Sequence, residues 1–282
     1  MTTIQDLGRV GYQAFGIPVS GPMDHSAASL ANVLVNNLPK EPVLEITLIG
    51  PEIEFNGSAV LAITGAPIDA SLNGKKLDLN RTYLTEKRAV LSIGRVRQGC
   101  RTYLAIRGNW QIKKWLNSAS WHQKNTTPDS WIQKGQQISI QTDQVNASEE
   151  LLNSIPSGLE IPAMNVKRPI SLLRGPEFDL LSQHQINQLR KQVFQIDPMS
   201  NRMGYRLNPA LNMDQILPSI ISSAVIPGTV QLTPSGQLIV LMADAQTTGG
   251  YPRIGVVKSE EMDRLGQLRP GDSFFWKIEN LQ

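Results

Sequence analysis

The chain has 282 residues, of which 40% are apolar, so it can bury the cores of two ordinary domains and is not globally disordered. Its net charge of +3 and pI of about 9.0 come without a run of basic residues, which argues against nucleic acid as a partner. Cys100 is the single cysteine, which excludes an intrachain disulfide and a cysteine-based metal site. Its strand-like surroundings favour a buried structural thiol over a nucleophile.

No membrane anchor or secretion signal is expected. The segment Met1–Asp6 has neither the basic nor the apolar region of a signal peptide. No apolar run approaches the ~20 residues that are needed to span a bilayer. We therefore expect a soluble, cytoplasmic protein that does not bind membranes.

The first segment is rich in turn formers and in polar side chains. Asp6, Arg9 and Tyr12 form a polar cluster within it. Asp24 then precedes a run of apolar residues at helical spacing, so we interpret it as a helix cap rather than a catalytic base. The apolar positions are Ala27, Leu30, Ala31 and Leu34. The helix is expected to end near Asn36, before Pro39.

From there to about residue 142 the pattern predicts mostly strands. Short apolar or alternating runs are separated by turn signals such as Asn56-Gly57 and Asn73-Gly74. The runs are Val43–Ile49, Ile53–Phe55, Ala59–Ile63 and Ala89–Ile93. Many short strands with few helices favour a sandwich or a barrel over a parallel α/β sheet.

Residues 146–168 are predicted to be a linker, because Pro and Gly recur there among few periodic apolar positions. A second helix is predicted from Asp179 to about Val193, followed by further strands. A short helical turn is expected around Glu260–Leu265, and a final strand over Phe274–Ile278. The predicted domains are therefore residues 1–145 and 169–282.

The two halves contain three similar sequence patterns in the same order. The patterns pair Arg9–Tyr12 with Arg202–Tyr205, Ile49–Ile63 with Ile226–Leu241, and Ile132–Ile138 with Leu268–Phe274. The first pattern continues to Met23-Asp24 in one half and to Met213-Asp214 in the other. Together these patterns predict two similar β-rich domains with a ligand cleft between them.

Residues 244–252 carry the densest set of functional groups in the second half. They follow the apolar run Leu238–Ala243, which has the pattern of a buried strand. They are Asp244, Ala245, Gln246, Thr247, Thr248, Gly249, Gly250, Tyr251 and Pro252. The glycines let the backbone approach a ligand, and the donors suit a carboxylate, a phosphate or a polarised carbonyl. A tight turn whose polar groups satisfy one another is the alternative.

The segment Asn201–Leu207 contains two guanidinium groups and a phenol. In an extended conformation Arg202 and Arg206 share one face, and Tyr205 lies on the other. The Arg pair suits bidentate binding of a carboxylate or a phosphate. A salt-bridged edge strand is the alternative interpretation.

Other signatures of catalysis are missing from the sequence. His25, His122 and His184 have no ligand-spaced companions, so no metal site is expected. The sequence also lacks a nucleophile elbow, a zinc-protease helix and a dinucleotide fingerprint. It has no P-loop signature, so ATP chemistry involving this protein would not use a P-loop.

A series of motifs in order resembles one protein family. The motifs are Thr3–Gln13, Pro18–Asp24, Leu44–Thr47, Asn201–Leu207, Pro227–Gln231, Gln246–Pro252 and Gln267–Asp272. On these residues the chain resembles the family of the 5-oxoprolinase C subunits, also called KipA-like, allophanate hydrolase subunit 2 or biotin-dependent carboxyltransferase. The likeness spans nearly the whole chain.

The resemblance implies a mainly β fold of tandem cyclophilin-like β-barrel domains with a few short helices. It also implies two partners, the KipI-like B subunit of 5-oxoprolinase and the A subunit of the same enzyme. Together the three would hydrolyse 5-oxoproline to glutamate at the expense of ATP, which the complex would bind. Fused relatives form the carboxyltransferase part of urea carboxylase, and biotin is implied only under that alternative. A non-enzymatic regulator that binds a KipI-like kinase inhibitor is the third alternative.

The chain departs from the family pattern at three places. Gly108-Asn109 stands where the family usually has Gly-Gly, and Asn117–Ser120 stands where a Gly-Ser-Arg-Ser-like segment is usual. Ala245 stands where Arg is common, so a fixed charge is missing from the expected site. This predicts either a shifted substrate preference or reduced activity.

The expected substrate is a small cyclic amide with a carboxylate and a lactam carbonyl. Asp6, Asp244 and Tyr251 are the candidates for proton handling. Arg202 or Arg206 is expected to bind the carboxylate, and the turn Gln246–Gly250 the carbonyl or a developing oxyanion. The remaining expected substrate-binding residues are Arg9, Tyr12, Tyr205, Gln231, Gln246, Thr247, Thr248, Gly249 and Gly250.

Overall fold

A computed structural model of the chain describes residues 1–122, 130–142, 168–214, 217 and 220–279. The chain divides into two compact units: unit 1 comprises Met1–Arg9 and Ser20–Ala163, and unit 2 comprises Val10–Val19 and Met164–Gln282. The grouping of Val10–Val19 with unit 2 was not predicted. The predicted linker, 146–168, lies outside the described residues except for Arg168, so the domain boundaries stay predictions.

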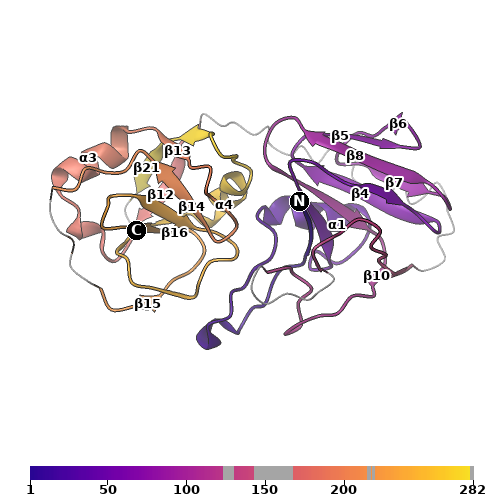
Figure 1. The fold of residues 1–282 in the computed structure, drawn as a ribbon, viewed down its shortest axis with the longest axis horizontal. Helices are drawn as coiled ribbons and strands as arrows, with labels where there is room; N and C mark the ends of the chain where they lie inside the picture. Colours follow the sequence, from indigo (N-terminus) through magenta and orange to yellow (C-terminus); the bar gives the residue numbers. More distant parts are fainter. Residues whose placement is uncertain (123–129, 143–167, 215–216, 218–219, 280–282) are drawn as a thin grey trace. The chain divides into compact units, whose positions relative to one another are not determined.

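Unit 1 contains two antiparallel sheets (Figure 1). The larger sheet has the order β1-β2-β9-β4-β7, and the smaller has the order β3-β8-β5-β6. The larger consists of β1 (Thr2–Gln5), β2 (Val43–Thr47), β4 (Ala59–Gly65), β7 (Thr82–Thr85) and β9 (Arg101–Ile106). The smaller consists of β3 (Glu52–Glu54), β5 (Ile68–Leu72), β6 (Lys75–Lys76) and β8 (Val90–Val96). A short pair, β10 (Asn109–Trp110) and β11 (Ile140–Gln141), forms a further ladder.

The strands predicted in this unit are confirmed, with shifted ends. The run predicted to reach Ile49 ends at Thr47, because Leu48 has a positive φ of 64° and leaves the extended conformation. The turn Asn73-Gly74 joins β5 to β6 with φ values of 49° and 78°, as a type I′ hairpin requires. Cys100 is 3% exposed, so the expected burial of its thiol is confirmed.

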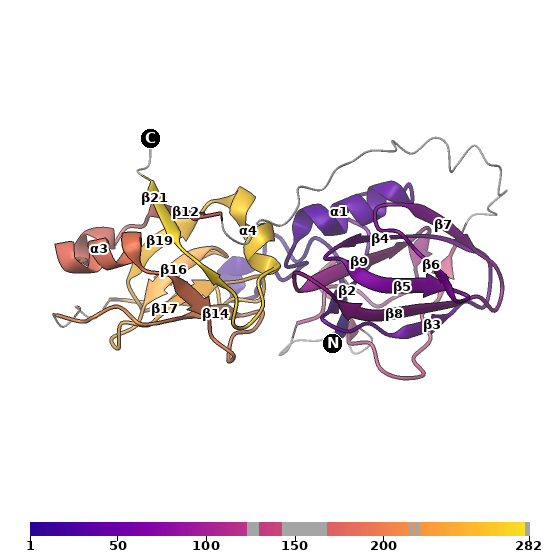
Figure 2. The ribbon, with the colours of Figure 1, turned by 90° about the horizontal axis from the view of Figure 1, so that it is seen from above.

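Helix α1 (His25–Leu34) covers β4 and β9 of the larger sheet (Figure 2). Its N-cap is Asp24, whose side chain accepts a hydrogen bond from the Ala27 amide at 2.9 Å, which confirms the predicted capping role. The helix buries a face of small residues, and the core cluster around it includes Ala27, Ala28, Ala31, Leu34, Val60, Ala62, Tyr103 and Ala105. Alanines let the helix approach the sheet closely.

Unit 2 is organised around one sheet of eight strands in the order β20-β13-β14-β17-β16-β19-β12-β21. The strands are β12 (Ile170–Arg174), β13 (Phe194–Ile196), β14 (Gly204–Asn208), β16 (Thr229–Leu232), β17 (Leu238–Leu241), β19 (Arg253–Val257), β20 (Ser273–Phe274) and β21 (Trp276–Glu279). Its neighbours pair antiparallel except β12 and β21, which are parallel. A separate short ladder joins β15 (Ser223–Ala224) to β18 (Thr248–Gly249).

This sheet curls into a nearly closed barrel. Strands β20 and β21 lie at opposite ends of the strand order, although only Phe275 separates them in the chain. Phe274 and Trp276 pack edge to face with ring centroids 4.8 Å apart. Closure removes most unpaired strand edges. A single final strand was predicted over Phe274–Ile278. This prediction is wrong in one respect, because Phe275 divides the segment into two strands, β20 and β21.

The second helix begins later than predicted. Phe178–Leu180 forms a short 3-10 turn (η3), and α3 runs from Gln183 to Lys191. Ser182 caps α3 in a capping box with Gln185, which fixes the start of the helix. The predicted turn around Glu260–Leu265 is confirmed as α4 (Ser259–Gly266). No helix among the described residues is long and apolar enough to cross a membrane.

Both units are β-rich, as the similar sequence patterns predicted, but their strands pair differently. In unit 1, β3 and β4 belong to different sheets, whereas in unit 2 the corresponding β16 and β17 form one antiparallel hairpin. The pattern that pairs Ile132–Ile138 with Leu268–Phe274 is confirmed at its glycine turn. Gly135 and Gly271 both have a positive φ there, of 80° and 91°. Local patterns specify strands and turns, whereas the pairing partner depends on tertiary packing.

Candidate functional site

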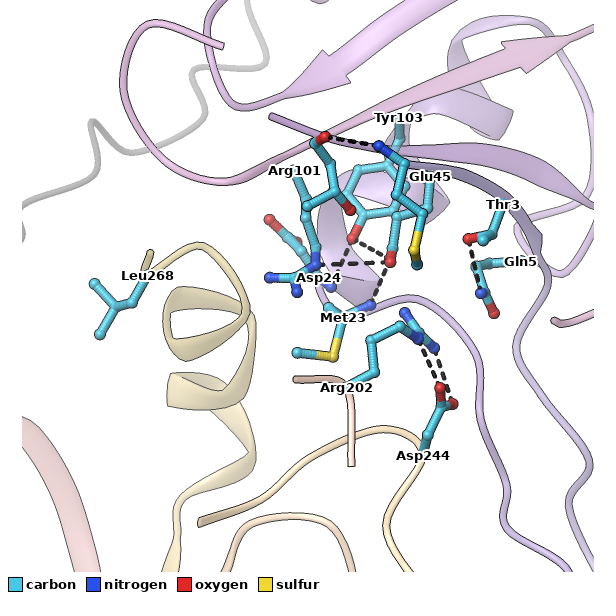
Figure 3. Close-up of polar contacts among 12 residues, drawn as sticks. Thr3, Gln5, Met23, Asp24, Glu45, Arg101, Tyr103, Arg202, Asp244 and Leu268 are labelled. Carbon is cyan, nitrogen blue, oxygen red and sulfur yellow. Dashed lines mark hydrogen bonds and ion pairs between the residues drawn. The ribbon is translucent and has the colours of Figure 1, made fainter. Parts of the chain in front are cut away.

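Residues 244–252, which follow β17 and form the loop of unit 2, are anchored by a buried ion pair. Arg202 donates through Nε to Asp244 Oδ2 at 2.8 Å and through Nη2 to Oδ1 at 3.0 Å (Figure 3). Their side chains are only 7% and 2% exposed. The Asp244 amide also donates to the Arg202 carbonyl at 2.9 Å. The structure therefore brings these two predicted site residues together, as partners of each other.

The expectation that Arg202 and Arg206 share one face is wrong. An isolated bridge between Asn201 and Gly204 closes a turn that contains Arg202, so strand alternation begins only at Gly204. On β14, Arg206 is exposed, and its Nη1 donates to Gln237 Oε1 at 3.0 Å. A bidentate grip formed by both guanidinium groups on one ligand therefore has no basis in this segment.

Tyr205 lies in the core of the barrel sheet. It is 3% exposed, and its hydroxyl donates to the Leu268 carbonyl at 3.5 Å. Its predicted place on the face opposite Arg206 is confirmed. Tyr251, by contrast, is 43% exposed beyond β18.

The first glycine of the loop, Gly249, lies against the amide of Gln231, which in turn contacts the amide of Gln246. Gln231, on β16, is 1% exposed, and its Oε1 accepts a hydrogen bond from Gln246 Nε2 at 3.5 Å. A Cβ built at Gly249 would lie 2.4 Å from Gln231 Nε2. Thr247, Thr248 and Gly250 complete the loop, and the last would place a Cβ 3.4 Å from Ser222 Oγ. Gln231, Gln246 and Gly249, all predicted from the sequence, therefore form one cluster.

The strand that faces this loop was missed by sequence reasoning. Ser223 pairs with Gly249, and Ala224 pairs with Thr248. Arg253, opposite Gln231 in the sheet register, donates through Nη1 to the Ala224 carbonyl at 3.2 Å. No pattern within 222–224 identifies this strand, because the ladder has only two residues on each side.

Arg253 is itself neutralised inside the unit. Its Nε and Nη2 donate to the Glu177 carboxylate at 2.9 and 2.6 Å, and its backbone amide donates to the same group at 2.9 Å. Hydrogen bonds from Arg253 hold the pKa of Glu177 below its ordinary value. Both Arg202 and Arg253 thus already bind carboxylates of this chain.

Ala245 occupies an apolar environment. It is 5% exposed and packs in a cluster with Val225 and Leu241. A longer, charged side chain at this position would have to leave that cluster or displace it. The alanine that departs from the family pattern is thus part of the local core.

In unit 1, Asp6 is a saturated hydrogen-bond acceptor. Its carboxylate accepts from the Gly8 amide, the Ser118 hydroxyl, the Ala119 amide and the Ser120 hydroxyl at 2.9, 2.5, 2.6 and 2.7 Å. The segment that departs from the family pattern, Asn117–Ser120, thus supplies most of these donors. Such a carboxylate stabilises the loop, because it accepts hydrogen bonds from two separate segments of the chain. Its predicted proton-handling role stays untested.

The other members of the N-terminal cluster have separate surroundings. Arg9 is 1% exposed, donates to the Ser120 carbonyl, and places its guanidinium carbon 5.0 Å from the centre of the Trp115 ring. Tyr12 is half-buried and begins the short 3-10 turn η1 (Gln13–Phe15) in the segment that groups with unit 2. The cluster that the sequence suggested is therefore divided between the units.

A buried network around Glu45 was not identified as a site from the sequence. The Glu45 side chain is 0% exposed, and its Oε2 accepts from the Met23 amide and the Tyr103 hydroxyl, each at 2.8 Å (Figure 3). The Tyr103 hydroxyl in turn accepts from the Asp24 amide at 2.9 Å. Burial, followed by the charges of Glu45 and Asp24, raises the pKa of Tyr103 well above its ordinary value of 10.0. The available signal was a glutamate inside the apolar strand β2.

Chemically, the loop of unit 2 offers neutral hydrogen-bonding groups supported by ion pairs that are already complete. This arrangement suits an uncharged polar group of a ligand. Among the described residues, no group of three or more His, Cys, Asp or Glu side chains has the arrangement of a metal site.

The sequence matches the family described as "Carboxyltransferase domain, subdomain A and B" over residues 15–277. The C subunit of 5-oxoprolinase from Haemophilus influenzae is 32% identical over 99% of this chain and 89% of its own length. The protein of the same description from Escherichia coli is also 32% identical, over 96% of this chain and 86% of its own length. "Urea amidolyase" of Saccharomyces cerevisiae is 31% identical over 96% of this chain, but over only 16% of its own length.

Solved structures agree with the sequence matches. The urea amidolyase of K. lactis has a TM-score of 0.85 and 28% identity, covering 98% of this chain and 18% of its own. The Kluyveromyces lactis urea carboxylase has a TM-score of 0.83 and 28% identity, with 98% and 26% covered. The chain thus corresponds to a small part of these two large proteins and to nearly the whole length of the bacterial subunits.

Proposed function

Since the chain belongs to the family of carboxyltransferase domains, subdomains A and B, we propose that it is one component of an ATP-dependent 5-oxoprolinase. In this proposal it acts with the KipI-like B subunit of that enzyme and with its A subunit, and the complex hydrolyses 5-oxo-L-proline to L-glutamate. ATP is bound by the complex, and the protein works in the cytoplasm.

The observation that carries the proposal is the match in length as well as in sequence. The two bacterial relatives, both described as the C subunit of 5-oxoprolinase, align with this chain over 86% or more of their own length. The urea amidolyase of Saccharomyces cerevisiae contains the corresponding segment in only 16% of its length. The bacterial proteins are therefore the better guide to how this chain operates.

The loop of unit 2 is the proposed binding region for the substrate. Neutral amides and hydroxyls suit the lactam group of 5-oxoproline, whereas Arg202 and Arg253 are engaged by Asp244 and Glu177. A triphosphate needs cations that are not already paired. We therefore assign ATP to another component of the complex, and Asp244 to the support of the loop.

A second candidate is the carboxyltransferase component of a biotin-dependent system. It is favoured by the family description and by the structural similarity to urea carboxylase. The ureido ring of biotin presents a carbonyl and two N–H groups, which the amides of Gln231 and Gln246 fit as donors and acceptors. When bound, biotin would supply the carboxyl group that is transferred, and these residues would only orient the ring.

The proposal is tested with purified components. This chain and the two proposed partners, the KipI-like protein and the third component of 5-oxoprolinase, are combined singly, in pairs and together. ATP hydrolysis and glutamate formation are measured with and without 5-oxo-L-proline, and we expect turnover that requires this chain. Absence of 5-oxoproline-dependent hydrolysis in every combination would refute the function. Carboxylation of urea in the presence of a biotin carboxylase and a biotin carrier would instead establish the second candidate.

A further inference from the structure

Gln231 has a buried amide group that the fold leaves incompletely used. The residue is 1% exposed, and its Nε2 has no hydrogen-bond partner among the described residues. Its Oε1 accepts a long hydrogen bond of 3.5 Å from Gln246 Nε2. Buried amide N–H groups are nearly always hydrogen-bonded in folded proteins, so this donor indicates a group that binds there.

The neighbouring backbone is shaped around that donor. A Cβ at Gly249 would lie 2.4 Å from Gln231 Nε2, although the φ of Gly249 is outside the range that only glycine adopts readily. Glycine therefore serves here for space and not for backbone conformation, because it lets the Gln231 amide lie directly against the backbone of β18.

A second unused donor lies on the facing strand. Ser223 pairs directly with Gly249, and its Oγ is also buried without a partner in the part of the chain that the structure describes. Both donors thus belong to residues next to Gly249, since Ser223 is its strand partner and the Gln231 amide lies against it. Two donors near one point of the backbone can together hold one oxygen atom.

The charges around the glycine select the type of oxygen. Arg253, the register partner of Gln231, is bound to Glu177, and Arg202 is bound to Asp244. Each cation is therefore balanced by a buried or half-buried carboxylate. An ionised carboxylate or phosphate would enter without a compensating charge, whereas an uncharged carbonyl would not.

We propose that Gln231 Nε2 and Ser223 Oγ bind the uncharged carbonyl oxygen of an amide or urea group in the substrate. This deepens the proposed function and rests on it for the identity of the compound, because 5-oxoproline carries such a group in its lactam ring. It assigns the loop of unit 2 to the lactam carbonyl and not to the substrate carboxylate.

Four compounds separate the groups that are recognised: 5-oxo-L-proline, 2-pyrrolidinone, L-proline and urea. 2-Pyrrolidinone keeps the lactam without the carboxylate, and L-proline keeps the ring and the carboxylate without the carbonyl. Binding to the full chain, alone and with its partner proteins, is measured by saturation-transfer NMR and by calorimetry. We expect 5-oxo-L-proline and at least one of 2-pyrrolidinone and urea to bind, and L-proline not to compete.

Three variants then locate the contact. Gln231→Met removes the donors at similar volume, and Gly249→Ala places a Cβ where the Gln231 amide now lies, so that the amide must shift. We expect either change to weaken binding by about tenfold, as for the loss of one or two uncharged hydrogen bonds. Gly255→Ala is the matched steric control, because its Cβ would meet Leu172 Cδ1 at 2.6 Å in the same sheet, and none of the three atoms nearest that Cβ belongs to Gln231. That variant is expected to lose stability and to keep its affinity.

A readout of stability separates binding from a structural role. Gln231→Met removes an unsatisfied buried donor, so its melting temperature should equal or exceed that of the wild type while its affinity falls. Unchanged affinity in Gln231→Met, or a wild type that binds L-proline but neither lactam, overturns the inference. So does a wild type that binds none of the four compounds.

The two proposals fail separately. Lactam or urea binding that depends on Gln231, without any 5-oxoproline-dependent ATP hydrolysis, keeps the inference and removes the proposed function. ATP hydrolysis with an unchanged KM for 5-oxo-L-proline in Gln231→Met keeps the function and removes the inference.

Discussion

Replacing Arg202 by Met tests whether the buried ion pair supports the loop of unit 2 or serves a ligand. The substitution leaves the Asp244 carboxylate, which is 2% exposed, without its bidentate partner. An uncompensated buried charge of this kind costs about 3–5 kcal/mol of unfolding free energy. For a unit of this size that corresponds to a fall in melting temperature of about 10 °C or more.

The double variant Arg202→Met, Asp244→Leu removes both charges together. Because a buried ion pair contributes little beyond an apolar pair of similar volume, most of the lost stability should return, and the coupling energy should be about 2–4 kcal/mol. Arg206→Met is the control, since its side chain is exposed and bonded to Gln237. Its effect should stay within about 0.5 kcal/mol.

Urea denaturation followed by circular dichroism, together with thermal melting, measures these free energies. Wild-type stability in Arg202→Met would refute the structural interpretation. If the same variant also failed to bind 5-oxo-L-proline, Arg202 would be a ligand for the substrate, as the sequence first suggested.

Three further predictions concern the rest of the chain. Asp6→Asn should lower the unfolding free energy by about 2–4 kcal/mol, because an amide cannot accept all the hydrogen bonds that the carboxylate accepts. Chemical denaturation measures this change. A loss below about 1 kcal/mol contradicts the role of Asp6 as the acceptor that holds its loop together. Burial and the charges of Glu45 and Asp24 raise the pKa of Tyr103 well above 10.0, so wild type and Tyr103→Phe should give the same ultraviolet tyrosinate signal as the pH rises through 10, where ordinary tyrosines ionise. The stabilising contribution of Tyr103 is then lost only above that pH. A smaller signal in the variant argues against the network with Glu45. The hydrogen bond from Lys258 lowers the pKa of Glu279 to about 2. The difference in unfolding free energy between wild type and Glu279→Gln should therefore be present at pH 7 and disappear as the pH falls from 4.5 towards 2. A difference that stays constant with pH contradicts a stabilising role for the Glu279 carboxylate.

The positions of the local elements followed from sequence patterns. Asp24 was interpreted as a helix cap and does cap α1, because capping depends on residues only three positions apart. The strand runs and the Asn73-Gly74 hairpin were likewise predicted from short patterns. The start of the second helix was misplaced because Ser182, not Asp179, completes a capping box.

The sequence also identified most residues of the candidate site without showing how they interact. Arg202, Asp244, Gln231, Gln246 and Gly249 were all singled out by residue type. Arg202 and Arg206 were nevertheless assigned to one face, since a turn before a strand cannot be distinguished from the strand by alternation alone.

The sequence by itself determined a β-rich chain in two parts, the cap of its first helix and the loop where polar groups gather, because each of these depends on neighbours in the chain. The tertiary structure decided that Asp244 neutralises Arg202 from 42 positions away and that Ser223 faces Gly249. It also decided that Gln231 keeps an unused buried donor among the described residues. Strand register and burial set these relations, and neither is encoded within a few adjacent residues.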